Sequence, residues 1–192
     1  MKILIATALA LNLCAAYGQE LERASPQCDA DLQEQARQGA DRGDPRQIYL
    51  MARYLSTGKC MPGDGKQAVH LYLKAASLGY APARYNLGIV AAGNQDFTSA
   101  EGHFFEGARL GHRGCELQLG ILYSLVPPPV GDDRKAYAWL LLTASRHEPI
   151  SREASELLAK VRARISDQAR VQAETLSAKL SADFGKITPF AQ

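Results

Sequence analysis

Apolar residues recur along this chain with the spacing of an α-helix. Three segments carry apolar or small residues at i, i+3, i+4, i+7 and i+8, the spacing that lines one face of a helix. These segments begin at Ala68, Ala100 and Ala136. Each follows another helical segment with small or apolar residues at fixed offsets, and these earlier segments begin near Gln47, Ala83 and Cys115. The pattern predicts three helix pairs, and no stretch of the sequence predicts a β-strand.

The helix pairs form an internal repeat that glycine marks. Copies begin at Gly43, Gly79 and Gly111, and His147 stands where a fourth glycine would fall, so the steps are 36, 32 and 36 residues. Periods of this size are typical of stacked helix pairs. Glycine adopts positive φ easily, so we expect Gly79 and Gly111 to end the helices that precede them.

The repeats divide the chain into segments. We expect an N-terminal segment with a capping helix at 19–42, three repeats at 43–78, 79–110 and 111–147, a C-terminal helical cap at 148–184 and a flexible tail at 185–192. Ser151 and Ser166 are the expected N-caps of the two helices in the C-terminal cap.

The repeat resembles the unit of the Sel-one-like repeat family, which is related to the tetratricopeptide repeats. That unit is approximately G-x-x-x-A-x-x-x-L-G-x-x-Y, a loop, and K-A-x-x-W-x-x-x-A-A-x-x-G. The matching positions are Gly79, Ala83, Leu87 and Gly88 in the second copy, and Gly111, Leu119, Gly120, Tyr123, Lys135, Ala136 and Trp139 in the third. The departures are Gln47 for alanine, Leu55 and Ala91 for tyrosine, and His147 for glycine. The resemblance implies an all-α fold, a right-handed α-solenoid of stacked antiparallel helix pairs with terminal capping helices.

The resemblance also implies a function. Members of the family typically act as adaptors that present a concave groove to a protein partner, although a fold alone does not fix a function. The first helix of each pair would line the groove, and arginine and tyrosine are common binding anchors. The candidate partner-binding residues are the first-helix positions that packing does not use: Arg46, Tyr49, Arg53, Tyr85, Asn86, Ile89, Leu117, Gln118, Ile121 and Ser124. The alternative is that Tyr49 and Tyr85 only pack between helices and that the arginines are solvated.

The first eighteen residues are predicted to be a signal peptide. Lys2 supplies a positive start, the apolar stretch 3–16 is too short to span a bilayer comfortably, and Ala16-Tyr17-Gly18 offers the small-x-small pattern of a cleavage site. The mature chain would begin at Gln19. A lipid anchor on Cys14 is disfavoured because Leu13 is too bulky for the position before a lipidated cysteine. We therefore expect export to the periplasm of a Gram-negative bacterium.

Three cysteines, Cys28, Cys60 and Cys115, remain after the signal peptide is removed. An odd number in an oxidising compartment predicts one disulfide and one free thiol. We expect a Cys28–Cys60 bridge that joins the capping helix to the first repeat and stabilises the fold by about 3–4 kcal/mol. If the two Cα atoms lie more than about 7 Å apart, both thiols stay free.

Charge and motif content argue against several function classes. The formal net charge is +2 and no basic run occurs, which disfavours nucleic-acid binding. His70, His103, His112 and His147 lack metal-ligand spacing, and no G-x-S-x-G or phosphate-binding glycine loop occurs. We therefore expect no enzyme activity, no cofactor, no metal and no transmembrane span, with a monomer as the free state.

Exported proteins of this family suggest a sharper function. The resemblance implies an immunity protein that neutralises a type VI secretion effector of the phospholipase type. One alternative is an envelope assembly adaptor with several partners. Another is weak β-lactamase or penicillin-binding activity, as in cysteine-rich members of the family, although this chain lacks their cysteine pairs and an S-x-x-K motif.

Overall fold

Aspartate and glycine mark the ends of the helices. In the computed structural model, which describes residues 29–145 and 150–184, an aspartate side chain accepts a backbone N–H bond at the start of five helices. These N-caps are Asp29, Asp44, Asp64, Asp96 and Asp132. Gly79 and Gly111 adopt φ of 83° and 86° directly after two helices, as their places in the repeat predict.

The described helices succeed one another with short connections. Their bounds are α2 (Ala30–Asp41), α3 (Pro45–Thr57), α4 (Gly65–Ser77), α5 (Ala81–Gly93), α6 (Phe97–Arg109), α7 (Arg113–Leu125), α8 (Asp133–Ala144), α9 (Ser151–Arg162) and α10 (Asp167–Phe184). No strand occurs within residues 29–145 and 150–184.

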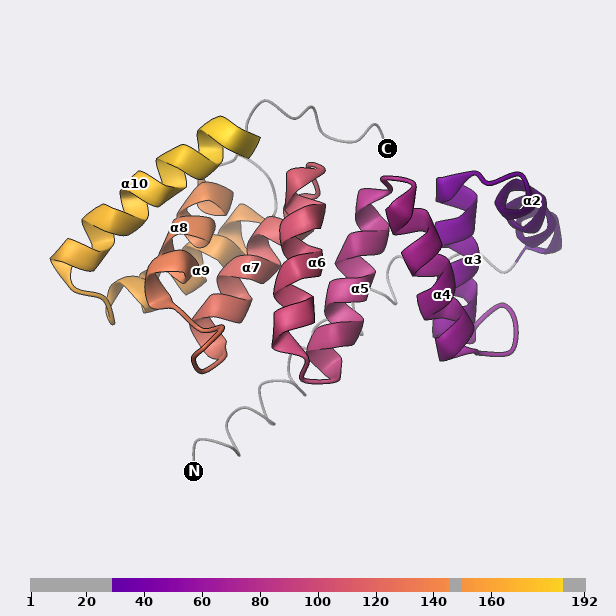
Figure 1. Ribbon diagram of the computed structural model, residues 1–192, viewed down its shortest axis with the longest axis horizontal. Helices are drawn as coiled ribbons and strands as arrows, with labels where there is room; N and C mark the ends of the chain where they lie inside the picture. Colours follow the sequence, from indigo (N-terminus) through magenta and orange to yellow (C-terminus); the bar gives the residue numbers. More distant parts are fainter. Residues whose placement is uncertain (1–28, 146–149, 185–192) are drawn as a thin grey trace.

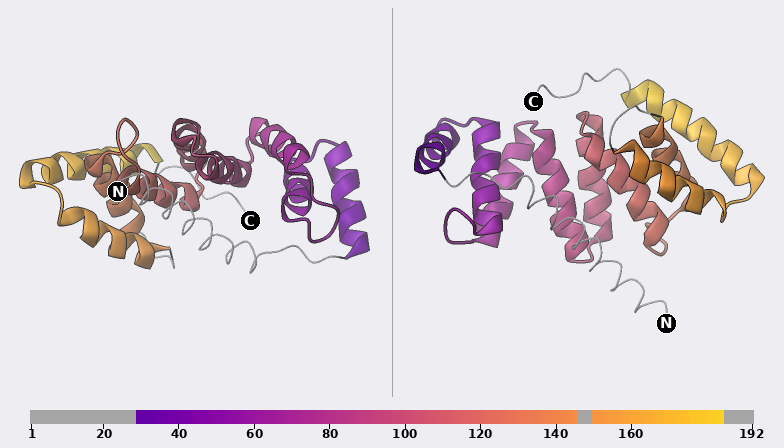
Figure 2. Two further views of the ribbon diagram at one scale, coloured as in Figure 1. Left: turned by 90° about the horizontal axis from the view of Figure 1, so that it is seen from below. Right: turned by 180° about the vertical axis from the view of Figure 1, so that it is seen from behind.

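Helix pairs stack in chain order along the long axis of the molecule (Figures 1 and 2). The pairs are α3–α4, α5–α6 and α7–α8, and successive pairs meet through α4 against α5 and α6 against α7. At one end α2 packs on α3, and at the other end both α9 and α10 pack on α8. α10 crosses α8 obliquely and forms that end of the stack (Figure 1). The predicted all-α repeat solenoid is confirmed.

Small residues on the first helix of a pair face large residues on the second. A β-carbon on Gly88 would lie 2.4 Å from the Phe104 ring, and one on Gly120 would lie 2.7 Å from the Leu140 side chain. Ala52 holds the corresponding position in the first pair. Helix axes can approach closely only where one helix presents little side chain, so these small residues set the spacing of the pairs.

The buried side chains form two hydrophobic cores. The first core runs from Ile48 to Leu87, and the second runs from Ala100 to Phe184. α5 contributes to both, because Ala83 and Leu87 belong to the first core while Tyr85 and Ile89 pack against the second. α5 is therefore the seam between the two halves of the solenoid.

The C-terminal cap differs from expectation at one residue. Ser166 accepts a bond from the backbone N–H of Ala169 at 3.2 Å, as predicted for an N-cap of α10. Ser151 is instead the first helical residue of α9, and Ile150 holds the N-cap position. The predicted signal peptide 1–18, Cys28, His147 and the tail 185–192 lie outside the described residues, so the predictions for them, including the Cys28–Cys60 bridge, stay predictions.

Candidate partner-binding face

Three tyrosines gather where the first helix pair meets the second. The Tyr49 ring, on α3, lies 5.8 Å from the Tyr72 ring and 5.0 Å from the Tyr80 ring, measured between centroids. Tyr72 comes from α4, and Tyr80 comes from the junction between α4 and α5. Tilted aromatic pairs at this separation attract one another beyond simple area burial. We call these three residues the tyrosine cluster.

Polar side chains hold the tyrosine cluster in place. The amide nitrogen of Asn86, on α5, donates to the Tyr49 hydroxyl at 3.1 Å and to the Pro82 carbonyl at 3.1 Å. The Tyr72 hydroxyl is bonded to the Ser56 hydroxyl at 3.1 Å. Asn86 is buried, and its amide nitrogen donates both of these hydrogen bonds within the protein, one to the cluster and one to its own helix. The orientation of Tyr49 is therefore fixed by α5 as well as by α3.

Arginine and burial set the electrostatics of the tyrosine cluster. The Arg53 guanidinium lies 5.9 Å from the centre of the Tyr49 ring, within cation–π range. Burial raises the pKa of Tyr49 and Tyr80, and it raises the pKa of Tyr72 to about 12. The charges of Arg46 and Arg53 oppose the rise in the pKa of Tyr80. All three phenols keep their protons at neutral pH, but Tyr72 is buried, so only the half-buried Tyr49 and Tyr80 lie partly at the surface.

A second aromatic contact lies at the junction of the second and third pairs. The Tyr85 ring, on α5, lies 4.9 Å from the His112 ring and 6.3 Å from the Phe104 ring. Burial lowers the pKa of His112 to about 4, so the imidazole is neutral at pH 7. Gly114 makes room for the stack, because a β-carbon there would lie 3.0 Å from both the Tyr85 and the His112 rings. Tyr85 thus packs between helices, which is the alternative considered for this residue.

The structure differs from expectation on α7. Leu117, Gln118 and Ile121 are only 3%, 3% and 4% exposed, although we expected packing not to use these positions. α7 contacts α9 in addition to α6 and α8, a neighbour that the repeat pattern does not predict. Every residue from Cys115 to Tyr123 is buried, so this helix has no open stripe. Within the described residues, the accessible part of the predicted face lies on α3, on α5 and at Ser124 near the end of α7.

The remaining predicted residues are placed as follows. Arg46 is exposed, whereas Tyr49, Arg53, Tyr85, Ile89 and Ser124 are half-buried. The Ser124 hydroxyl donates to the Ile121 carbonyl at 3.0 Å, and its own carbonyl accepts from Arg164 at 3.2 Å. The structure thus joins Tyr49, Arg53 and Asn86 by direct contact, and it places Ser124 in a different set of contacts. Whether any of them binds a partner stays a prediction.

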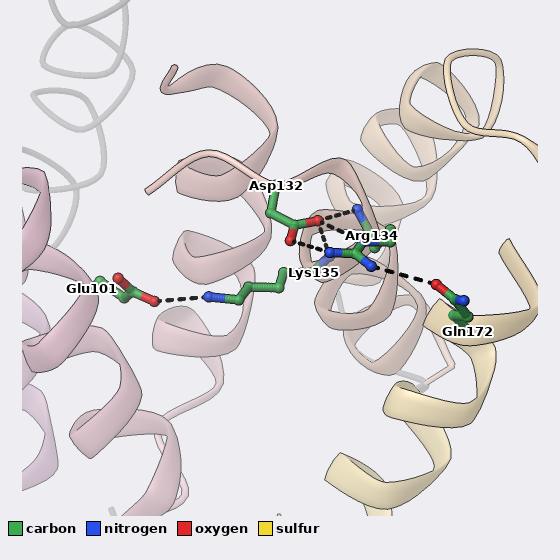
Figure 3. A network of polar contacts seen from close by, with 5 residues as sticks. All are labelled: Glu101, Asp132, Arg134, Lys135 and Gln172. Atoms are coloured by element: carbon green, nitrogen blue, oxygen red, sulfur yellow. Dashed lines mark hydrogen bonds and ion pairs between the residues drawn. The ribbon is translucent and has the colours of Figure 1, made fainter. Parts of the chain in front are cut away.

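A polar network holds the loop between α7 and α8. The Tyr123 hydroxyl donates to Glu101 at 2.6 Å, and the Lys135 ammonium lies 3.5 Å from the same carboxylate oxygen. On the other side of the loop, Arg134 pairs with Asp132 at 3.2 Å and reaches Gln172 of α10 at 3.4 Å (Figure 3). The network links α6, α8 and α10, so it stabilises the packing of these helices against one another.

The sequence does not predict the tyrosine cluster. The apolar pattern that begins at Ala68 places Tyr72 in the core, where it lies, but it gives no sign of the contacts that Tyr72 makes with Tyr49 and Ser56, and it singles out neither Tyr80 nor Ser56. Tyr80 directly follows Gly79, which begins the second repeat, and this placement could have indicated that its side chain lies at a junction. Ser56 gives no comparable signal, because its partner Tyr72 is sixteen residues away on another helix.

Across residues 29–145 and 150–184, no three His, Cys, Asp or Glu side chains lie close enough together to hold a metal ion. In the same ranges, none of the helices has the length and apolar character needed to cross a membrane.

Comparison with known proteins identifies the repeats. The model of the Sel1 repeat matches residues 48–80 and 114–147. No curated protein matches the chain. The chain is similar to the crystal structure of c5321, a protective antigen present in uropathogenic Escherichia coli strains that displays an SLR fold, with 19% identity and a TM-score of 0.42. The alignment covers 79% of this chain and 41% of that chain, so this chain spans less than half the length of that protein.

Proposed function

Because the chain contains Sel1 repeats at residues 48–80 and 114–147, we propose that it is an exported, non-catalytic protein-interaction module of the bacterial periplasm. Sel1 repeats imply protein partners. The observation that carries the proposal is the tyrosine cluster, with Arg53 and Asn86 in contact with Tyr49. Aromatic and arginine side chains held rigidly on helices lose little entropy on binding and are the usual anchors of protein interfaces.

A narrower version of the proposal concerns the partner. We propose that the chain is an immunity protein that neutralises a type VI secretion effector of the phospholipase type. Its support is the resemblance to exported proteins with these repeats. An immunity protein binds one toxin in a fixed ratio, whereas an envelope assembly adaptor binds a mixed set of proteins. Stoichiometry therefore separates the two versions.

The test is a pull-down with the exported form of the chain. Tagged residues 19–192, the expected mature form, would be incubated with periplasmic extract, and the captured proteins would be identified and quantified. One partner in a fixed ratio supports the immunity version, and several partners support the adaptor version. Capture of nothing above the level of an untagged control would contradict the module itself. Hydrolysis of nitrocefin above background would contradict its non-catalytic character.

A further inference from the structure

We propose that residues 185–192 bind back onto the outer face of the second helices, with the ring of Phe190 between Leu73 on α4 and His103 on α6. The outer face is the side of α4, α6 and α8 on which α10 lies. The inference goes beyond the proposed function, because it concerns a contact within the chain and not a partner. The occupant is the segment of this chain that directly follows α10.

Phe184, the last residue of α10, shows how the outer face holds an aromatic ring. Its ring lies 5.5 Å from the Trp139 ring on α8 and 5.7 Å from the Phe105 ring on α6, and both pairs meet edge to face. The Phe105 and Trp139 rings lie 6.2 Å apart. Phe184 is buried in this position. One aromatic side chain therefore bridges two successive second helices.

The repeat places an equivalent pair of residues one step earlier. Phe105 and Trp139 are the fifth and the third residue after the alanines that begin the apolar stripes of α6 and α8. Leu73 and His103 hold the same two positions in α4 and α6. Equivalent positions of stacked repeats have equivalent surroundings, so the step from α4 to α6 offers a second place for an aromatic ring.

This second place is open in the part of the chain that the structure describes. Leu73 is 47% exposed, which is more than the 40% of Phe105, although both are large apolar side chains. α8 carries both α9 and α10, whereas α4 packs on α3 and α5. Burial lowers the pKa of the half-buried His103, so its ring is uncharged at neutral pH and can be covered without desolvating a charge.

The segment after α10 begins close enough to reach this place. α10 runs from the C-terminal end of the stack toward α6, and its last residue already contacts Phe105 (Figure 1). Packed helix axes lie about 8–10 Å apart, and α4 and α6 both pack on α5, so their own axes lie at most about 20 Å apart. Phe190 follows Phe184 by six residues, which span about 20 Å when extended.

The composition of residues 185–192 suits an apolar surface. Ile187, Pro189 and Phe190 are apolar, and Lys186 is the one charged residue of the segment. Pro189 has a fixed φ, which reduces the backbone entropy that the segment loses on binding. The repeat pattern alone predicts a flexible tail, because it ends at Phe184. The exposed Leu73 favours a bound segment instead.

The direct test places the photo-crosslinking residue benzoylphenylalanine at position 190 of the exported form of the chain, residues 19–192. After irradiation, the monomeric product would be digested and its crosslinks mapped by mass spectrometry. We expect crosslinks to the peptides that contain Leu73 and His103. Benzoylphenylalanine at position 171, an exposed site on α10, is the matched control and should give no crosslink to α4.

Urea denaturation tests the same contact without a crosslinker. Phe190→Ala should lower the equilibrium constant for folding at least threefold, whereas Gln192→Ala, in the same segment, should leave it unchanged. In a double-mutant cycle, Leu73→Ala and Phe190→Ala should couple by at least threefold. Val171→Ala removes an exposed apolar side chain from α10 and should not couple with Phe190→Ala.

Two outcomes would overturn the inference. Crosslinks that join position 190 only to a second molecule would show a contact between chains and not within one. Additive effects of Leu73→Ala and Phe190→Ala, with crosslinks scattered over the surface, would show that the segment is free. Both outcomes leave the interaction module standing, because the pull-down tests that proposal separately.

Discussion

The ring of Phe104 occupies the space that a side chain on Gly88 would need. A β-carbon at position 88 would lie 2.4 Å from Cε1 of Phe104, a ring that is almost fully buried. Contacts of this length do not occur between real side chains, so α5 and α6 would have to move apart to admit even a methyl group.

Gly88→Ala should therefore destabilise the protein by about 1–3 kcal/mol, because the buried ring has no free volume to move into. Urea denaturation of the variant and wild type would measure the difference. Gly102→Ala is the matched control, since nothing lies within 4 Å of its β-carbon position on α6. That variant should gain roughly 0.5–1 kcal/mol from helix propensity. Equal effects at the two sites would mean that the helix pair is not tightly packed.

His112 should make the folding free energy depend on pH. Burial lowers its folded pKa to about 4, below the ordinary value of 6.5. The unfolded chain therefore binds a proton that the folded chain does not bind between these two values, so stability falls as the pH is lowered from about 6.5 to about 4. The contribution is at most about 3 kcal/mol.

Urea denaturation at pH 7.5, 6 and 5 would measure this slope. His112→Gln should flatten most of it, with a smaller part left to His103, whose pKa burial also lowers. His70→Gln, at an exposed position on α4, is the control and should leave the slope unchanged. An unchanged slope in His112→Gln would show that this imidazole is solvated in the folded state.

The hydrogen bond from Tyr123 to Glu101 should couple the third pair to the second. It joins α7 to α6 at 2.6 Å, and the acceptor is a carboxylate that Lys135 also approaches. We expect Tyr123→Phe to lower the unfolding free energy by about 1–2 kcal/mol. In a double-mutant cycle with Glu101→Gln, the coupling energy should exceed about 0.5 kcal/mol. Strict additivity would indicate that the two groups do not interact in solution.

Trp139 should report on the C-terminal cap. It is the only tryptophan of the chain, and its ring lies 5.5 Å from that of Phe184 and 6.2 Å from that of Phe105. Phe184→Ala should shift the fluorescence emission to longer wavelength and cost about 3 kcal/mol, because it uncovers a buried indole. Val171→Ala, on the same helix but 57% exposed, should leave the emission unchanged. A shift of the same size in both variants would mean that α10 detaches as a whole.

Local features of the sequence predicted the stack well. Glycine at the repeat junctions and small residues opposite large ones are signals that recur within about 36 residues, so they can be recognised without a structure. Ser166 follows the same logic, because an N-cap bonds to a residue only three positions away. These features depend on neighbours along the chain.

Contacts between distant residues were not predictable in this way. The ring centroids of Phe184 and Phe105 lie 5.7 Å apart, although Phe105 belongs to a helix pair two pairs earlier in the chain. The periodicity of the sequence does not predict this contact. The same limit applies to α7, where contact with α9 accompanies the burial of positions that the repeat pattern alone would leave open. The helices that carry the candidate face could therefore be predicted, but which of its positions are accessible could not, and partner binding at this face stays a prediction.

The contribution of α5 to both cores affects how the two halves of the solenoid unfold locally. Since α5 contributes to both cores, we expect the half from Asp29 to Ser77 to open while the aromatic packing around Trp139 stays intact. Amide hydrogens in α3 and α4 should then exchange with solvent earlier than those in α8. A molecule clamped across α3 and α5 would tie the opening of one half to that of the other, and slower exchange throughout α3 and α4 would accompany its binding.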